Sequence, residues 1–366
     1  MKLDFDAIII TSDEPYSKMW HTQLIYTEYL SKSNIVFFIN PPKKWSLKNV
    51  FTLKLLEFNK VDNLTVINYN NILPSFIKTF NLFNEQVNEK NIAKELNKIK
   101  ASKLLIWHFD SFKNAFFNNF YSKTIIIKRL YHVIDPFYNN PLDKLLCELA
   151  NLIIITSPRL NNYYKNYENK IINIPQCLDI ELQHKLINVK SNVKLKINGN
   201  YFVLLGTISD DIDFNWILEL LKIPNFKLVI IGKKINIVKS INQSQIVFNH
   251  ANVEYLGVLS PQEFYPIVKN ALAGLILYSE EKTKQPRSPL KALNYLIAGI
   301  PTITNIDCEI TQLLGSCIYY VQNTNEISDF INKAIYKEIN FNFDQAKGYL
   351  QTVSIKNVVK SLIQKL

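Results

Sequence analysis

Glycine is scarce in this sequence, which has only 8 glycines among its 366 residues. None of them forms the Gly-x-Gly-x-x-Gly fingerprint of dinucleotide-binding turns, and there is no glycine-rich P-loop. An ordinary dinucleotide-binding or P-loop protein is therefore not expected. A phosphate can still be held by the start of a helix, so other nucleotide-binding folds remain open.

Cysteine is equally sparse, and the four cysteines include no Cys-x-x-Cys pair: Cys147, Cys177, Cys308 and Cys317. Disulfide frameworks and zinc sites need paired or clustered cysteines. We therefore expect reduced thiols in a cytosolic protein.

Long apolar runs are also missing. The longest, residues 271–278, falls far short of the roughly 18 residues that span a bilayer, and it reads as a buried strand. Residues 1–6 are acidic, and the apolar run after them is too short for a secretory signal. These absences predict a cytoplasmic protein, with the inner face of the membrane as an alternative location.

Acidic residues are outnumbered, because 42 lysines and arginines against 31 aspartates and glutamates give a net charge of +11. Basic proteins often bind nucleic acid, anionic membranes or anionic substrates. The lysines are dispersed and do not form the dense cluster of a nucleic-acid interface. The charge is compatible with a membrane surface or with phosphates, and no nucleic-acid partner is expected.

What the sequence does contain is a regular series of short, β-branched apolar runs. Such runs predict strands covered on both faces, and the helix signals between them predict parallel sheets. The runs are residues 7–11, 35–39, 64–67, 104–107, 124–127, 153–156 and 171–174, then 202–205, 228–231, 253–256, 274–277, 302–304 and 318–321. They suffice for two sheets, so the predicted fold class is α/β with two Rossmann-like domains.

The domain boundary is expected near residue 182. Residues 183–200 are polar, rich in lysine and asparagine, and precede a fresh strand at Tyr201. The chain is also too long for one ordinary core. We predict a first domain of residues 1–182 and a second of residues 183–353.

A predicted helix that begins at Ser288-Pro289 and ends at Gly299 carries the clearest signal for a site. Its apolar residues share one face, whereas Lys291 and Asn294 share another side. The free N–H groups of its first turn and the positive helix end suit a diphosphate. Helix physics alone leaves a structural helix with a solvated lysine as an equal alternative.

The stretch from Gln285 to Pro301, followed by an apolar strand, resembles the donor-binding helix of GT-B glycosyltransferases of the bacterial cell-envelope type, such as group 1 and teichuronic-acid enzymes. Further segments resemble the same family in the same order: residues 150–160, 174–179, 202–213, 227–232, 252–257 and 260–278. Each motif is short, but their order and spacing together are specific. The resemblance covers most of residues 100–310.

This resemblance implies the GT-B fold, in which two Rossmann-like domains face a cleft and the C-terminal helix, here residues 354–366, crosses back to the first domain. It also implies a nucleotide-diphosphate sugar as donor. It assigns the diphosphate to Lys291, the N–H groups around Ser288 and Leu290, and the Gly206-Thr207 loop. Arg287 and Pro289 are further donor-binding residues that it implies. It places Asn294 at the ribose or sugar and Gly232 near the base.

The sequence departs from the family pattern at two positions. Asn294 stands where the family usually has glutamate, and Pro286 stands where it often has another. Those carboxylates commonly contact donor hydroxyls, whereas asparagine is neutral. Glu280 and Glu281, in the same loop, are candidates to compensate. An alternative interpretation is therefore a catalytically degraded GT-B subunit that acts as a binding or partner protein.

Candidate catalytic groups follow predicted strands of the first domain, where ligands of open α/β sheets bind. A base must deprotonate the acceptor hydroxyl if the anomeric centre inverts. Asp135 is the preferred base. The other candidates are Asp110, His108 and Asp13. The structural alternatives are a turn before Pro136 for Asp135 and a structural hydrogen bond for each histidine.

Asp211-Ile212-Asp213 matches the Asp-x-Asp metal motif of the other large glycosyltransferase class, GT-A. The motif precedes a predicted helix, where aspartates serve as N-caps and first-turn charges. We therefore predict no obligatory metal and no other cofactor.

Residues 42–56 and 72–80 mix lysines with large apolar side chains. Such segments either lie in an anionic membrane interface or pack against their own domain. A lipid-linked acceptor is one consequence of the first option. The sequence thus predicts a hexosyltransferase-like enzyme that moves a sugar from a nucleotide-diphosphate sugar to a carbohydrate or lipid-linked acceptor, in cell-surface polysaccharide or glycoconjugate synthesis.

Overall fold

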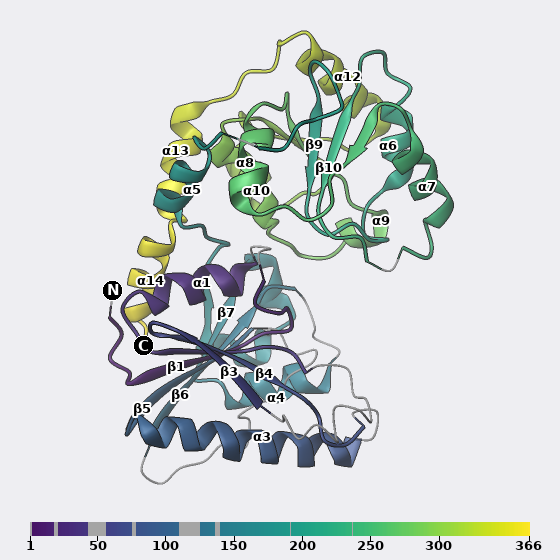
Figure 1. The fold of residues 1–366 in the computed structure, drawn as a ribbon. Helices are drawn as coiled ribbons and strands as arrows, with labels where there is room; N and C mark the ends of the chain where they lie inside the picture. The colour runs from purple at the N-terminus through teal and green to yellow at the C-terminus, as the bar shows by residue number, and fades with distance from the viewer. Residues whose placement is uncertain are drawn as a thin grey trace. The chain divides into compact units, whose positions relative to one another are not determined.

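The computed structural model of the chain describes residues 2–17, 21–42, 56–74, 78–109, 125–135, 140–190, 192–235 and 237–366. Contacts divide it into two compact units, one extending to Pro175 and the other from Gln176 to Lys365 (Figure 1). Each unit has a predominantly parallel sheet with helices packed on it, which confirms the predicted α/β class. Among the described residues, no helix is long and apolar enough to cross a membrane.

The first unit contains an eight-stranded sheet in the order β3-β4-β2-β1-β5-β6-β7-β8. Its strands are β1 (Ala7–Thr11), β2 (Val36–Ile39), β3 (Leu56–Val61), β4 (Leu64–Tyr69), β5 (Lys103–Phe109), β6 (Ile126–Val133), β7 (Leu152–Ile155) and β8 (Ile171–Asn173). Its helices are α1 (Thr22–Ser31), α3 (Lys78–Lys98), α4 (Pro141–Leu149) and the 3-10 helices η1 (Pro158–Asn162) and η2 (Lys165–Lys170). All paired strands are parallel except β3 and β4, which form an antiparallel hairpin.

Helices α1 and α3 cover opposite faces of this sheet (Figure 1). Successive strand residues point to opposite faces, so Ile106 packs with Ile92 of α3, whereas Trp107 packs with Tyr26 of α1. Each fully buried side chain of this size contributes about 1.5–3 kcal/mol relative to exposure. The sheet is therefore a rigid base for the residues that follow its strands.

Two strands of the first sheet differ from the sequence-based expectation. β3 was not expected, because an exposed edge strand reading Leu-Glu-Phe-Asn-Lys-Val lacks a buried apolar run. β6 continues to Val133, well beyond the expected end at residue 127, because it pairs with β5 along its length. His132 consequently lies within β6, and His108 lies within β5, which extends to Phe109.

The second unit contains a six-stranded, fully parallel sheet in the order β11-β10-β9-β12-β13-β14. Its strands are β9 (Phe202–Leu205), β10 (Leu228–Ile231), β11 (Val253–Tyr255), β12 (Gly274–Ile276), β13 (Thr302–Thr304) and β14 (Ile318–Tyr320). Its helices are α5 (Ile180–Leu186), α6 (Phe214–Leu220), α7 (Ile241–Asn249), α8 (Pro261–Lys269), α9 (Glu280–Thr283), α10 (Leu290–Ala298), α11 (Glu309–Leu313), α12 (Thr324–Ile335), α13 (Phe343–Thr352) and α14 (Ile355–Ile363). All of these strands coincide closely with predicted apolar runs, because strands buried on both faces leave a clear mark in the sequence.

The starts of α8 and α10 differ in how they are capped. At α8, the N–H of Ser260 donates to the Glu263 carboxylate at 2.8 Å, as a capping box requires. At α10, the prediction that Ser288 caps the helix was wrong. The capping position belongs to Pro289, and no side chain caps this helix. Gly299 ends α10 in the left-handed conformation, with φ of 74°, as expected.

Candidate functional site

The strand order of the second unit reverses beside β9. Strands β10 and β11 lie on one side of it, and β12, β13 and β14 lie on the other. Open α/β sheets bind ligands beyond the carboxyl ends of their strands at such a reversal. Gly206 follows β9 there, Gly232 follows β10, and Tyr278 lies just beyond β12.

Gly206 and Gly232 are in direct contact. A Cβ atom at Gly232 would stand 1.8 Å from the carbonyl oxygen of Gly206, and φ of Gly232 is +149°. Gly206 has φ of +113°, and its N–H donates to the carbonyl of Ile231 at 2.9 Å. Only glycine fits both positions without strain, so the backbone beyond β9 and β10 is open to close approach. Thr207, the next predicted residue, is half-buried in the same loop.

The Lys291 amino group lies beside Gly206, one member of this glycine pair. A Cβ atom at Gly206 would be 3.2 Å from Lys291 Nζ, and the same amino group lies 4.8 Å from the ring centroid of Tyr278. Within the described part of the chain, Lys291 forms no salt bridge. A cation held beside open backbone without a counter-ion favours an anionic ligand.

The first turn of α10 adds to this electrostatic preference. Pro289 has extended backbone angles, Leu290 is the first helical residue, and the helix has no side-chain cap. The uncapped N–H groups of a helix start attract anions, because they carry partial positive charge and lack partners within the helix. Because Ser288 does not cap α10, no capping side chain competes with a ligand for these N–H groups. This favours an anion at the start of α10.

Tyr295 fixes α10 on the sheet. It is fully buried, and its hydroxyl accepts a hydrogen bond from the N–H of Leu205, at the end of β9, at 2.9 Å. Its ring lies on Gly274, where a Cβ atom would stand 2.3 Å from Tyr295 Cδ2. This contact sets the position of Lys291, one helical turn earlier. The role of Tyr295 was not predicted, because its signal is only a tyrosine in a helix and a glycine that opens a strand.

Asn294 is held by the neighbouring helix. Its Oδ1 atom accepts a hydrogen bond from the Tyr265 hydroxyl at 2.7 Å. Burial raises the pKa of Tyr265 well above its ordinary value, so this hydroxyl stays a donor. The orientation of the Asn294 amide is therefore fixed by a neutral hydrogen bond.

Arg287 approaches the same aromatic ring as Lys291. Its Cζ atom lies 5.6 Å from the centroid of Tyr278, and Nη2 donates to Gln285 Oε1 at 3.3 Å. Tyr278 is itself fixed, because its N–H and carbonyl both bond to the Asn305 side chain at 2.9 and 2.7 Å. The structure thus brings two predicted cations together around one tyrosine.

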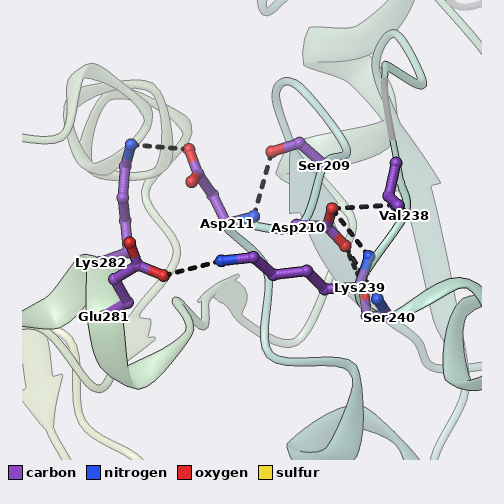
Figure 2. A network of polar contacts seen from close by, with 8 residues as sticks. All are labelled: Ser209, Asp210, Asp211, Val238, Lys239, Ser240, Glu281 and Lys282. Carbon is purple, nitrogen blue, oxygen red and sulfur yellow. Dashed lines mark hydrogen bonds and ion pairs between the residues drawn. The ribbon is translucent and has the colours of Figure 1, made fainter.

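A polar network joins the loops around the glycine pair (Figure 2). The Asp210 carboxylate accepts hydrogen bonds from the backbone N–H groups of Val238, Lys239 and Ser240, at 2.9, 3.1 and 2.9 Å. These bonds hold the pKa of Asp210 well below its ordinary value. The loop after β9 is thereby fastened to the loop after β10.

The other aspartates of this loop have structural partners. Asp213 caps α6 by accepting from the N–H groups of Asn215 and Trp216, as predicted for the Asp-x-Asp motif. Asp211 forms a 2.8 Å ion pair with Lys282 of α9 (Figure 2). Among the described residues there is no group of three or more His, Cys, Asp or Glu side chains suited to a metal ion.

Candidate groups of the first unit follow three neighbouring strands, β1, β5 and β6. Asp13 is nearly buried just after β1, and Asp135 is half-buried just after β6. His108 lies at the end of β5, with Nδ1 3.0 Å from the Thr11 hydroxyl. Burial lowers the pKa of His108 to about 3, so its imidazole is neutral and a weak proton acceptor. Asp110 lies outside the described residues.

His132 is a buried group that the sequence analysis did not single out. It stacks on Phe109 at a centroid distance of 4.7 Å and contacts Tyr26 and Trp107. Burial lowers its pKa to about 3. Within the described part of the chain, neither ring nitrogen has a hydrogen-bond partner. The imidazole is therefore part of an aromatic core cluster.

Comparison by sequence gives no relatives: no family model matches the chain, and no curated protein matches it. Solved structures do resemble it over 98% of its length. The first is the E. coli trehalose-6-phosphate structure bound with UDP-2-fluoro glucose, with 11% identity, 98% of that chain covered and a TM-score of 0.67. The second is the lipopolysaccharide outer core galactosyltransferase WaaB, with 12% identity, 100% coverage and a TM-score of 0.61. The third is sucrose-phosphate synthase from Thermosynechococcus elongatus, with 10% identity, 98% coverage and a TM-score of 0.65.

At this level of identity the likeness concerns the fold. It extends over nearly the full length of all three chains, so it includes both parallel-sheet units. The chain therefore has the GT-B fold that the order of its sequence motifs predicted.

Proposed function

We propose that this protein is a glycosyltransferase whose donor is a nucleotide-diphosphate sugar bound in the second unit. The observation that carries the proposal is the position of Lys291 Nζ beside Gly206, whose carbonyl lies against Gly232. A diphosphate there would meet a full positive charge, open backbone and the uncapped start of α10 together. The structural neighbours support the proposal by their common fold, and one of them is bound with UDP-2-fluoro glucose.

The same groups fit the chemistry of sugar transfer. When the bond between the anomeric carbon and the diphosphate breaks, negative charge develops on the leaving diphosphate oxygens. A fixed ammonium group and helix N–H groups stabilise that charge without reorganising. Lys291 and the first turn of α10 are the groups that we assign to this step. Gly232 is assigned to the region of the base, and Asn294 to the ribose or sugar.

Asp135 remains our preferred base for the acceptor hydroxyl, followed by Asp13 and Asp110. His108 is the least favoured of the four, because a buried imidazole with a pKa of about 3 holds a proton poorly. If the reaction retains the anomeric configuration, no such base is needed, and the carboxylates serve to orient the acceptor. Asp135→Asn separates these cases, since it abolishes an inverting reaction and only weakens a retaining one.

We further propose a carbohydrate or lipid-linked acceptor and a role in cell-surface polysaccharide or glycoconjugate synthesis. The fold likeness to the galactosyltransferase WaaB supports this choice. A membrane interface was one of two alternatives for residues 42–56 and 72–80, and of these, residues 43–55 and 75–77 lie outside the described residues. We propose no obligatory metal, because Asp211 and Asp213 are engaged in an ion pair and a helix cap. Transfer that stops with EDTA and returns with a divalent ion would contradict this.

The direct test is turnover of nucleotide sugars. The purified chain is incubated with UDP-, GDP- and dTDP-linked hexoses, with and without membrane-lipid and oligosaccharide acceptors, and released nucleoside diphosphate is measured. We expect release with at least one donor and a strong loss in Lys291→Met. Lys347→Met is the matched control, because Lys347 is an exposed lysine of α13, remote in sequence from the site. No turnover with any donor would reject the enzyme.

A degraded GT-B subunit that binds a nucleotide sugar without turnover is the second candidate. It is favoured by Asn294, whose Oδ1 already accepts the Tyr265 hydrogen bond and which cannot supply the charge of a glutamate. Under this alternative, donors stabilise the protein but no nucleoside diphosphate is released. Asn294→Glu should then introduce turnover, whereas an active enzyme should lose activity with the same change.

A further inference from the structure

The first unit has a groove of about 570 Å³ between helix α1 and the β3–β4 hairpin. This volume lies within the range of small-molecule sites in proteins. Amide side chains dominate its polar lining: Asn40 after β2, Asn59 on β3, Asn63 in the hairpin turn and Asn68 on β4. The lining residues named here lie in the described part of the first unit.

The hairpin presents one complete face to the groove. Strand pairing sets Asn59 opposite Val66 and Val61 opposite Leu64, and these residues share a face because strand side chains alternate. The other face of β4 is buried in the core through residues such as Ile67. Val61 is 70% exposed. The groove wall formed by the hairpin thus combines amide and apolar side chains.

A chain of hydrogen bonds fixes two of these amides, Asn40 and Asn68. The N–H of Tyr16 donates to Asn40 Oδ1 at 2.6 Å, and Asn40 Nδ2 donates to Asn68 Oδ1 at 2.6 Å. Asn68 Nδ2 then donates towards Glu57 Oε2 at 3.4 Å. Each amide oxygen has two lone pairs and each amide nitrogen two hydrogens, so the chain leaves both donors and acceptors for a ligand. Their orientation is set before any ligand binds.

The charges of the groove argue against an anionic ligand. Among the lining residues that the structure describes, Lys32 is the only cation, whereas Glu28 and Asp62 are both acidic. The Tyr16 hydroxyl donates to the Glu28 carboxylate, which places an aromatic ring at the groove. This lining differs from the donor site, where the charged groups are cations. It matches a ligand whose hydroxyl groups both donate and accept and whose C–H faces pack on Val61 and Tyr16.

We propose that this groove is a binding site for an uncharged carbohydrate. If the proposed function holds, the ligand is a segment of the acceptor glycan, and the groove supplies acceptor affinity separate from the donor site. Asn59 and Asn68 are the hydrogen-bonding groups of the site, and Asn40 positions Asn68. Binding at this groove requires no nucleotide sugar, so it is measurable on the protein alone.

The test is affinity electrophoresis of the full chain through gels that contain dextran, soluble starch or galactomannan, with hyaluronate as an anionic comparison. At least one neutral polysaccharide should retard the wild type, and Asn59→Ala and Asn68→Ala should each weaken binding about tenfold, as expected for the loss of a well-placed hydrogen bond. Lys60→Ala is the matched control, because Lys60 lies on β3 with its side chain on the opposite face. Asn59 is exposed, so its replacement should leave the fold intact even if Asn68→Ala does not.

Three outcomes would overturn the inference. They are a wild type that no neutral polysaccharide retards, retardation by hyaluronate alone, and binding that survives both asparagine replacements. Stabilisation by nucleotide sugars is measured on the same variants. Intact donor stabilisation without polysaccharide binding refutes the groove and leaves the proposed function standing. Polysaccharide binding without any stabilisation by nucleotide sugars supports the groove and counts against the proposed function.

Discussion

The amino group of Lys291 lies against Gly206, so that even a methyl group at Gly206 would stand 3.2 Å from Nζ. The two residues are far apart in sequence. They meet because Tyr295 fixes α10 on the sheet while β9 ends at the same edge. This contact brings two separate sequence motifs together into one surface, which we propose binds the donor diphosphate.

Replacing Gly232 by alanine should disrupt that surface and destabilise the second unit. The added Cβ would stand 1.8 Å from the Gly206 carbonyl oxygen, and the φ of +149° is unfavourable for any side chain. The clash is with backbone atoms, which cannot shift without further strain. We therefore expect the free energy of unfolding to fall by roughly 2–4 kcal/mol. Urea unfolding followed by circular dichroism measures it.

Gly348→Ala is the control for this prediction. Gly348 lies inside α13, where an added Cβ would meet no atom within 4 Å. Alanine favours helix by about 1 kcal/mol over glycine, so this variant should be unchanged or more stable. Equal stability of the two glycine variants would show that the Gly206–Gly232 contact is not as close as described.

Asp210→Asn should destabilise the second unit in a pH-dependent way. The carboxylate accepts three backbone hydrogen bonds, which lower its pKa below the ordinary 3.8. A lowered folded-state pKa gives stability that is complete above about pH 4 and is lost as the pH falls further. We expect a loss of roughly 1 kcal/mol at neutral pH, since solvent screens this exposed site.

The measurement is the unfolding free energy of both proteins across the acidic range. The gap between wild type and Asp210→Asn should narrow as the pH falls below about 4, because the wild-type carboxyl then becomes neutral as well. A gap that stays constant down to the lowest workable pH would mean that the negative charge of Asp210 contributes nothing.

His132→Phe should make the first unit more resistant to acid. Burial lowers the folded-state pKa of His132 to about 3, whereas an unfolded histidine titrates near 6.5. Protons therefore bind the unfolded state first, and stability falls as the pH drops below about 6.5. This histidine alone contributes a slope of up to about 1.4 kcal/mol per pH unit. Unfolding curves between about pH 6.5 and pH 5 should show a smaller slope in the variant.

At neutral pH, His132→Phe should be neutral or stabilising. A phenylalanine ring can join the cluster of Tyr26, Trp107 and Phe109 without leaving buried nitrogens unpaired. His108 titrates in the same range and remains in the variant, so part of the slope should persist. An unchanged slope would contradict the burial of the His132 imidazole.

Most of the strands could be predicted from the sequence, because burial on both faces requires an apolar run. Strands buried on both faces, such as β9 and β10, must be apolar throughout, and both coincide with predicted runs. The exposed edge strand β3 carries no such requirement, and it was missed. The end of β6 was also missed, because Arg129 and His132 interrupt its apolar run.

The candidate site was readable only in part. Gly206, Gly232 and Lys291 were named from sequence, and the structure brings them together. The contact of Tyr295 with Gly274, which positions α10, depends on two residues that no local pattern connects. The uncapped start of α10 was also not predicted. Ser288-Pro289 has the sequence of an N-cap followed by proline, but the N-cap position belongs to Pro289, which has no side-chain capping bond.

Donor binding by wild type and Lys291→Met tests the central claim most directly. A thermal-shift panel of nucleotide sugars should identify at least one donor, which at 100 times its Kd adds about 2.7 kcal/mol of stability. Without ligand, Lys291→Met should melt at the same temperature as the wild type. It should bind that donor about 10- to 100-fold more weakly, because one charge-assisted contact is lost. Lys347→Met should behave as the wild type. A donor that stabilises wild type and Lys291→Met equally would contradict a diphosphate site at Lys291 and Gly206.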